Sequence, residues 1–263
     1  MSLTAPPLDP HLVADAVRRQ RPIEQACYLI AAVLVLAGVA HLGVALALPR
    51  PWDGPLSWRK PVTFGLSFGT VLASITWVTS YLRMPDRRRT VLLGVFAADC
   101  VVEVTGITLQ AWRHVPSHFD TVGALSSAVA FSLAAGGVVL VVTLGTFALT
   151  ALRGRIDAAP PMRRALRAGF ALLLAGLAAG VAMIARGEAL IGQGERTLAY
   201  DTAGFLKWFH AISLHAVLVL PALAWLAART RLDEQRQLRV VTAGVGAYLL
   251  AAAAALVANL LLV

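Results

Sequence analysis

The sequence predicts an all-α, polytopic membrane protein: a bundle of about seven transmembrane helices with its N-terminus inside and its C-terminus outside. Three observations predict this fold. Hydrophobic residues make up 58% of the 263 residues and charged residues only 14%, against about 25% charged residues in a typical soluble domain. The charged residues gather in short clusters between long apolar stretches. Basic residues are also distributed unequally between alternate loops.

The apolar stretches define the spans, because roughly 18 or more apolar residues are long enough to cross a bilayer as a helix. The third span differs from the others in carrying two carboxylates, Asp99 and Glu103. We expect one transmembrane domain, 25–263, after a cytoplasmic segment, 1–24, that contains a short helix at 11–20. The predicted spans are 25–49, 61–82, 90–112, 121–152, 168–185, 208–228 and 240–263.

The basic residues predict the orientation. The N-terminal segment and the loops on its side hold 16 Lys and Arg residues, and the opposite side holds seven. Cytoplasmic loops carry the excess of basic residues. We therefore expect a protein of the inner membrane of a bacterium, with this side facing the cytoplasm. The net charge of +9 therefore does not indicate a nucleic-acid partner, and the sequence lacks zinc-ligand spacings and RNA-binding motifs.

Small residues predict where helices approach closely. Gly65 and Gly69 in the second span, and Gly176 and Gly180 in the fifth, form small-xxx-small patterns. Such patterns let helix backbones approach closely. Close packing matters in lipid because no hydrophobic force drives the helices together there. We interpret these glycines as packing positions.

Three ionisable side chains on three different spans are predicted to lie at one depth. At a rise of about 1.5 Å per residue, His41, Glu103 and His215 lie about 10 to 13 Å below the outer ends of their helices. Ionisable groups inside a membrane are costly and mark functional sites. We predict that His41 and His215 bind a haem b or a transition metal, with Glu103 as a further metal ligand or a proton acceptor. The alternative is that each group is satisfied separately by its neighbours.

The third span carries a polar stripe. Asp99, Glu103, Gly106 and Gln110 are spaced four, three and four residues apart, so they share one helix face. Two carboxylates in a dry environment cannot both ionise easily, which suggests proton chemistry for Asp99 and Glu103. The stripe is predicted to line a cavity or a proton path, and the alternative is a buried polar seam between two helices.

The outer ends of the helices are rich in basic and aromatic side chains. They either anchor the bundle at the membrane interface or form a lid over the predicted site. The candidate residues are Arg59, Lys60, Arg113, His114, His118 and His210.

Three segments resemble a group of bacterial multispanning membrane proteins without a known activity. The resemblance implies the membrane topology and the importance of the outer face, but no chemistry. The group has Gln where this chain has Leu218. The segments are Ser57-Trp58-Arg59-Lys60-Pro61, then Gln110-Ala111-Trp112-Arg113 with Pro116-Ser117-His118-Phe119, and His210-x-x-x-x-His215-Ala216 with Pro221.

These observations lead to one leading function and two alternatives. The leading hypothesis is a haem- or metal-binding redox protein of the membrane. The first alternative is a transporter or proton-coupled permease that uses Asp99, Glu103 and Gln110. The second is a non-catalytic membrane subunit or assembly factor. The expected partners are the lipid bilayer and a quinone, a lipid or another membrane subunit, and the sequence does not decide whether the protein is an enzyme.

Overall fold

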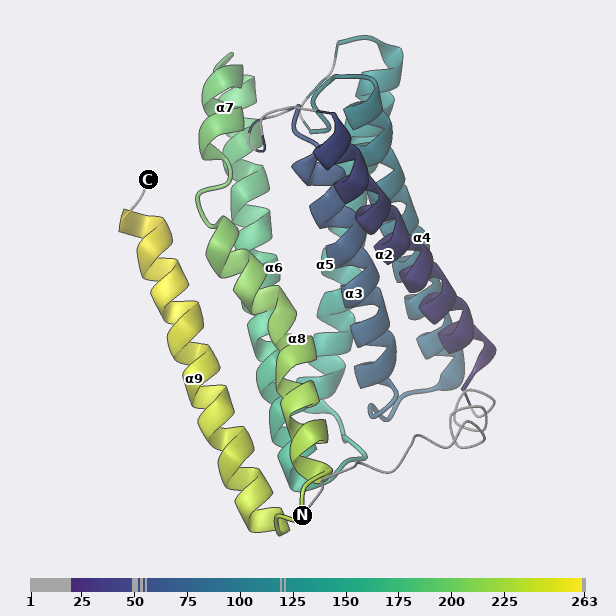
Figure 1. Ribbon diagram of the computed structural model, residues 1–263, viewed down its shortest axis with the longest axis vertical. Helices are drawn as coiled ribbons and strands as arrows, with labels where there is room; N and C mark the ends of the chain where they lie inside the picture. Colours follow the sequence, from purple (N-terminus) through teal and green to yellow (C-terminus); the bar gives the residue numbers. More distant parts are fainter. Residues whose placement is uncertain are drawn as a thin grey trace.

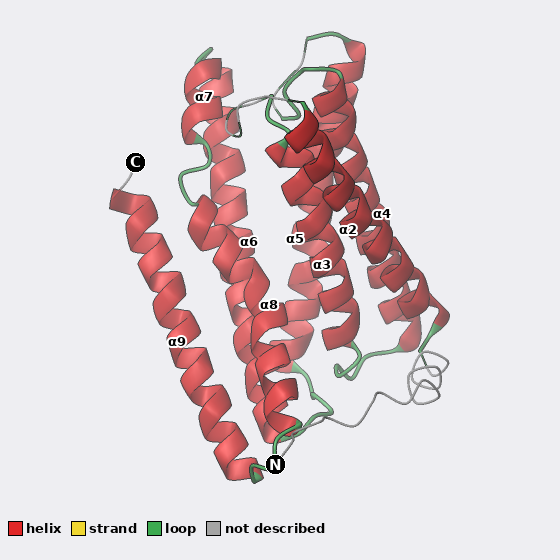
Figure 2. Cartoon of the chain, in the orientation of Figure 1, coloured by secondary structure: helices red, strands yellow, loops and turns green. Residues whose placement is uncertain are grey.

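The structure is a computed structural model that describes residues 20–48, 52, 54, 56–118, 120 and 122–261. Within these residues the chain forms eight α-helices, and its β-structure is a single isolated bridge between Leu82 and Ile156 (Figure 2). Seven of the helices are long and apolar enough to cross a membrane, which confirms the predicted number of spans. The helices are α2 (Pro22–Ala47), α3 (Arg59–Thr79), α4 (Asp86–Trp112), α5 (Ala124–Arg153), α6 (Pro160–Gly192), α7 (Arg196–Thr202), α8 (Lys207–Ala228) and α9 (Glu234–Leu261).

The helix boundaries differ from the predicted spans at several ends. The fifth span was predicted at 168–185, but α6 runs from Pro160 to Gly192. Helical hydrogen bonds do not require apolar side chains, so a helix can continue beyond the apolar stretch into water. Proline is favoured at the first helical position, and α2 and α6 both begin with a proline. The short helix predicted at 11–20 falls almost entirely on residues outside the described part of the chain.

The helices form two groups that share a central contact. On one side α2 packs against α3 and α4, and on the other α8 packs against α6 and α9 (Figure 1). The groups are joined by α5, which contacts both α4 and α6, and by a contact of α3 with α8. In this arrangement α3 lies between α2 and α8, and α9 lies at one edge of the bundle.

The predicted glycine contacts are confirmed. A Cβ atom added to Gly65 would lie 2.7 Å from the Cα atom of Gly38, so α2 and α3 touch backbone to backbone there. A Cβ atom on Gly176 would lie 3.0 Å from the backbone nitrogen of Leu214, where α6 meets α8. Side chains larger than hydrogen would separate these helix pairs.

Two polar side chains fix α9 against α8. The side chain of Asn259 accepts a hydrogen bond of 3.0 Å from the backbone N–H of Phe209, in the first turn of α8. The hydroxyl of Tyr248 donates a hydrogen bond of 2.7 Å to the carbonyl of Ile212. The first N–H groups of a helix have no partner within it, and Leu206, which precedes α8, supplies no side-chain cap. Asn259 therefore provides the missing cap from a neighbouring helix.

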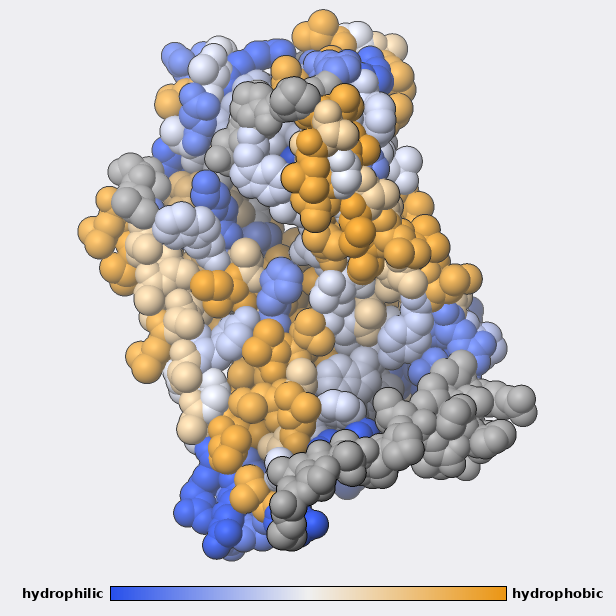
Figure 3. All heavy atoms as spheres, viewed as in Figure 1, coloured by the Kyte–Doolittle hydropathy of each residue, from blue (hydrophilic) through white to orange (hydrophobic). Residues whose placement is uncertain are grey.

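The surface of the bundle is consistent with a lipid environment. Many large apolar side chains are exposed along α2, α5 and α9, including Leu36, Phe131 and Leu250. A broad apolar region crosses the middle of the molecule, and hydrophilic atoms gather toward its two ends (Figure 3). The fold is thus that of a multi-pass membrane helix bundle.

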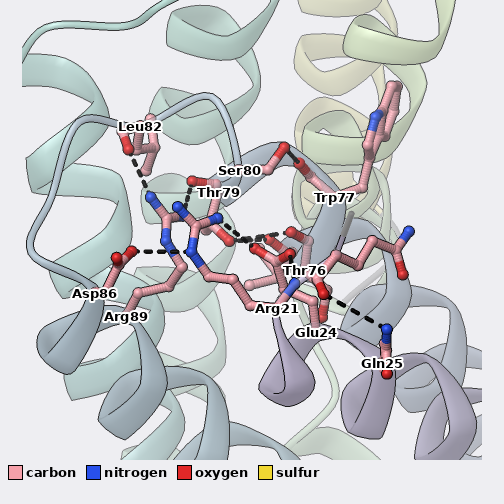
Figure 4. A network of polar contacts seen from close by, with 12 residues as sticks. Arg21, Glu24, Gln25, Thr76, Trp77, Thr79, Ser80, Leu82, Asp86 and Arg89 are labelled. Carbon is pink, nitrogen blue, oxygen red and sulfur yellow. Dashed lines mark hydrogen bonds and ion pairs between the residues drawn. The ribbon is translucent and has the colours of Figure 1, made fainter. Parts of the chain in front are cut away.

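A polar cluster joins the ends of α2, α3 and α4 that the basic residues predict to be cytoplasmic. We call Arg21, Glu24, Asp86 and Arg89 the inner cluster (Figure 4). Arg21 donates hydrogen bonds to Glu24, at 3.0 Å from its backbone and 3.1 Å from its guanidinium, and to Asp86 at 2.9 Å. These bonds tie the start of α2 to the start of α4.

Arg89 completes the inner cluster from within the bundle. Its buried guanidinium donates to the carbonyl of Thr79 and, at 2.8 Å, to that of Leu82. Thr79 is the last residue of α3, where carbonyl groups lack helical partners and carry a partial negative charge, and Leu82 lies in the turn that follows. Arg89 therefore caps α3 from α4.

Candidate functional site

The carboxyl groups of Asp99 and Glu103 lie together on α4 against Gly136 of α5. A Cβ atom added to Gly136 would lie 2.5 Å from Oε1 of Glu103 and 2.8 Å from Oδ1 of Asp99. The two side chains therefore fill the space that a larger residue on α5 would occupy. We call Asp99, Glu103 and Gly136 the carboxyl site.

The carboxyl site is buried and lacks a positive partner. Only 7% of Asp99 and 4% of Glu103 are exposed. Oδ2 of Asp99 is buried without a hydrogen bond, and no described Lys, Arg or His forms an ion pair with either carboxyl group. An ionised carboxylate without a partner is very costly in an apolar environment, and two adjacent charges are costlier still. The arrangement favours at least one bound proton.

An apolar layer covers the carboxyl site on the side of the Gln110 end of α4. Gly106, one turn beyond Glu103, contacts Leu133 and Val129 of α5, where an added Cβ atom would lie 3.0 Å from Cδ2 of Leu133. Val129, Leu133 and Ile107 form a separate buried cluster, which we call the apolar layer. The predicted polar stripe is therefore not continuous in this conformation. It is a seam between α4 and α5 that contains an apolar interruption.

Beyond the apolar layer, Gln110 organises the end of α4. Its side chain is fully buried, donates a hydrogen bond of 3.4 Å to the carbonyl of Pro116 and accepts one from Arg113. Arg113 also donates to the hydroxyl of Ser126 on α5, at 3.3 Å. The polar end of the stripe thus connects α4, α5 and the loop between them.

His114 terminates α4 in a left-handed conformation, with φ of 60°. Its backbone N–H donates to the carbonyl of Ala111, and that of Val115 donates to the carbonyl of Gln110. This pair of hydrogen bonds is a Schellman motif, in which glycine usually occupies the left-handed position. A histidine there introduces backbone strain at the outer end of the bundle.

Lys60 and His118 meet around one hydroxyl group. The ammonium of Lys60 donates to the hydroxyl of Ser117 at 3.3 Å, and that hydroxyl lies 2.9 Å from Nδ1 of His118. The ring of His118 also packs against Phe64. Burial, reinforced by the positive charge of Lys60, lowers the pKa of His118 to about 4. His118 is therefore neutral at physiological pH.

Arg59 lies beside this group and braces the loop before α3. Its side chain donates to the carbonyl of Trp52 at 3.2 Å, and its backbone N–H donates to the hydroxyl of Ser57 at 2.9 Å. These contacts fit the anchoring interpretation of the outer basic residues.

His41 belongs to an aromatic cluster at the C-terminal end of α2. Its Nε2 accepts a hydrogen bond of 3.1 Å from the indole of Trp112, and its Nδ1 lies 2.8 Å from the carbonyl of Ala37. Because an indole only donates and a carbonyl only accepts, the ring is neutral with its proton on Nδ1. Trp58 packs within 6.3 Å of the ring centre. Both ring nitrogens of His41 are thus engaged within the protein.

The two histidines of α8 point to separate surroundings. Nδ1 of His215 bonds to the carbonyl of Ala211 in its own helix, at 2.7 Å. Nδ1 of His210 bonds to the carbonyl of Gly176 on α6, also at 2.7 Å, and its ring fills the space above Gly180. His210 is therefore a packing contact between α6 and α8.

The predicted convergence of His41, Glu103 and His215 is not found. Nowhere in the described part of the chain do three or more His, Cys, Asp or Glu side chains form a group that could hold a metal ion. The reason is the helix arrangement, because α3 lies between α2 and α8, while Glu103 faces α5. Haem or metal binding by His41 and His215 stays a prediction.

Two features of the candidate site escaped the sequence reasoning. Gly136 faces the carboxyl pair, and Leu133 closes the stripe, yet both lie in a fourth span without any charged residue. The pair Gly136-Gly137 in the middle of that span was the available signal, since glycine inside a helix often marks a close approach.

Comparisons of the chain with known protein families, with curated proteins and with solved structures find no match. The resemblance drawn from the short segments above accordingly stays a prediction.

Proposed function

We propose that this chain is a proton-coupled transporter of the bacterial inner membrane, in which Asp99 and Glu103 bind and release the coupling proton. The observation that supports this proposal is the carboxyl site. Two carboxyl groups are each more than nine-tenths buried in a membrane-spanning helix and have no cationic partner among the described residues. Intramembrane carboxyl groups of this kind are typical of proton relays in pumps and transporters.

The chemistry follows from the pairing of the two acids. While the carboxyl site is dry, a proton on one group removes the cost of a second negative charge beside the first. When water reaches the carboxyl site, hydration stabilises the ionised form and the proton is released. Alternate hydration from the two sides of the membrane would move one proton per cycle.

The apolar layer gives this cycle a gate. Leu133 seals the carboxyl site by packing onto Gly106, and Gly136 supplies a second side-chain-free position one turn away on α5. A shift of α5 along α4 would lift Leu133 from Gly106. No side-chain hydrogen bond would break at Gly106, Leu133 or Gly136, because these residues have no polar side chain. From the distribution of basic residues, this gate would open to the outside.

The decisive experiment measures solute-driven proton movement. Protein reconstituted into liposomes with an internal pH indicator is given a proton gradient, and amino acids, organic acids, sugars and inorganic cations are added in turn. One solute class should accelerate the collapse of the gradient in the natural protein. Glu103→Gln and Asp99→Asn should lose this acceleration.

The matched control is Glu188→Gln, which neutralises an exposed carboxylate on α6 and should retain the flux. Equal flux in Glu103→Gln and the natural protein would overturn the proposal, as would the absence of solute-driven flux for every class. An absorption spectrum and a metal analysis of the same sample would test the haem and metal hypothesis directly.

A further inference from the structure

We infer that the arginines at the start of α6 form a binding site for the phosphate headgroup of an anionic phospholipid. Two adjacent hollows, of about 360 and 340 Å³, open at this end of the bundle. Both are lined by Arg163 and Arg167, and the larger also by Arg164 and Leu238. Hollows of this size fall within the range of sites for small ligands.

No described carboxylate forms an ion pair with Arg163, Arg164 or Arg167. Arg163 donates to the carbonyl of Ala158 at 3.2 Å, and Arg164 donates to the hydroxyl of Thr242 at 3.0 Å. Both acceptors are neutral. Arg167 forms no hydrogen bond or ion pair with any described residue. Arg163, Arg164 and Arg167 thus line the larger hollow, and two of them also line the smaller one, without a counter-charge among the described residues.

The one carboxylate that lines either hollow does not neutralise the group. Asp157 lines the smaller hollow, but its carboxylate pairs with Arg83 at 3.4 Å. Arg155, which lines the same hollow, adds a further positive charge. The hollows therefore carry a net positive charge.

The helix itself adds to the positive potential. The N-terminus of a helix carries a partial positive charge, so basic residues in its first turns are unfavourable unless an anion is near. The first turn of α6 contains no acidic residue, yet Arg163, Arg164 and Arg167 lie in its first two turns. A phosphate group would remove both repulsions and would accept paired hydrogen bonds from the guanidinium groups.

The position favours a lipid headgroup as the source of the phosphate. The apolar stretch of α6 begins directly after Arg167, so the arginines lie where the hydrocarbon core meets the headgroups. Leu238 of α9 gives the larger hollow an apolar wall, against which an acyl chain can pack. Basic pockets between transmembrane helices at this level bind anionic headgroups.

The test compares two double variants that remove the same charge. Arg163→Gln with Arg167→Gln alters both hollows, whereas Arg87→Gln with Arg88→Gln removes two exposed arginines from the start of α4. The purified full chain in neutral detergent is titrated with phosphatidylglycerol or phosphatidylcholine of identical acyl chains. Bound lipid is counted by native mass spectrometry.

We expect the natural protein to retain phosphatidylglycerol in preference to phosphatidylcholine. Retention should weaken about thirtyfold in the α6 variant, because it loses two basic residues that each attract an anionic membrane surface, and should stay unchanged in the α4 variant. Should the α6 double variant fail to fold, Arg167→Gln alone removes a side chain without a described partner and should still weaken retention.

Three results would overturn the inference. Equal losses in the two double variants would mean that only general charge attracts the lipid. Equal retention of both lipids by the natural protein would mean that the headgroup is not recognised. Displacement of phosphatidylglycerol by millimolar inorganic phosphate would assign the hollows to free phosphate instead of a lipid.

Discussion

The inner cluster and the carboxyl site bury glutamates to the same extent but treat them in opposite ways. Glu24 is 5% exposed and Glu103 is 4% exposed. Glu24 accepts two hydrogen bonds from Arg21, whereas Glu103 faces Asp99 and a glycine. A partner stabilises a buried charge, and its absence makes the protonation state sensitive to water. Glu24 therefore has the surroundings of a structural ion pair, whereas Glu103 has the surroundings of a group that can bind and release a proton.

The largest effect should come from removing the cap that the inner cluster places on α3. Arg89→Ala leaves the buried carbonyl of Leu82 without its donor and leaves that of Thr79 with the backbone N–H of Leu82 alone. Because charged hydrogen bonds contribute about 1.5–3 kcal/mol each, we expect the free energy of unfolding to fall by about 3 kcal/mol. Thermal unfolding in detergent measures it, with the exposed Arg88→Ala as control. Equal stability of the two variants would show that α3 needs no cap.

The two glutamates provide the most direct test of the comparison. Glu24→Gln weakens bonds to a cation, so it should lower the free energy of unfolding by about 1–2 kcal/mol. Glu103→Gln removes only a charge without a partner, so it should leave stability unchanged or increase it. Infrared spectroscopy should show a protonated carboxyl band at neutral pH that is lost in Glu103→Gln or Asp99→Asn. If Glu24→Gln and Glu103→Gln lowered the free energy of unfolding equally, the two glutamates would not differ in how the protein stabilises them.

The loop between α4 and α5 should show a pH dependence because burial and the positive charge of Lys60 disfavour protonation of His118. The pKa of His118 is about 4 in the folded protein and about 6.5 in the unfolded chain. The unfolded chain therefore binds more protons between these values, and stability should fall as the pH falls from about 6.5 to 4. The effect should be modest, because the ring is only half-buried.

Thermal unfolding across this pH range measures the slope. His118→Gln should flatten it, and Lys60→Met should flatten it partly by removing the nearby charge. An unchanged slope in His118→Gln would mean that another group controls the acid sensitivity.

The smallest effect should come from relieving strain at the end of α4. His114 adopts a left-handed conformation, which costs roughly 1 kcal/mol for a residue with a side chain. His114→Gly should therefore stabilise the protein by about that amount, less the greater entropy of glycine in the unfolded chain. A loss of stability would show that the contacts of the His114 side chain outweigh the strain, and His114→Ala separates the two contributions.

Hydropathy predicted the spans because a membrane requires long apolar stretches whatever the helices contact. It could not predict α7 (Arg196–Thr202), which is short and polar, or the extension of α6 into water. The shared face of Asp99 and Glu103 followed from helix periodicity alone and was predictable. Their contact with Gly136 was not, because periodicity within one helix does not say which neighbour it faces.

The absence of a three-residue group of His41, Glu103 and His215 in the described part of the chain has the same origin. Counting residues from the outer ends of the helices estimates depth but not lateral position or rotation about the helix axis. The structure surrounds α2 with α3 and α4, and α8 with α6, α9 and α3. Two histidines at one depth can therefore belong to different helix contacts, as His41 and His215 do.

The cap that Asn259 places on α8 has a consequence for the order of assembly. The ribosome makes α8 before α9, so the first turn of α8 is made before the side chain that accepts the hydrogen bond of the Phe209 N–H. Only after the following helix has inserted can that group find its acceptor. Newly made chains therefore pass through an interval in which the start of α8 lacks its side-chain cap.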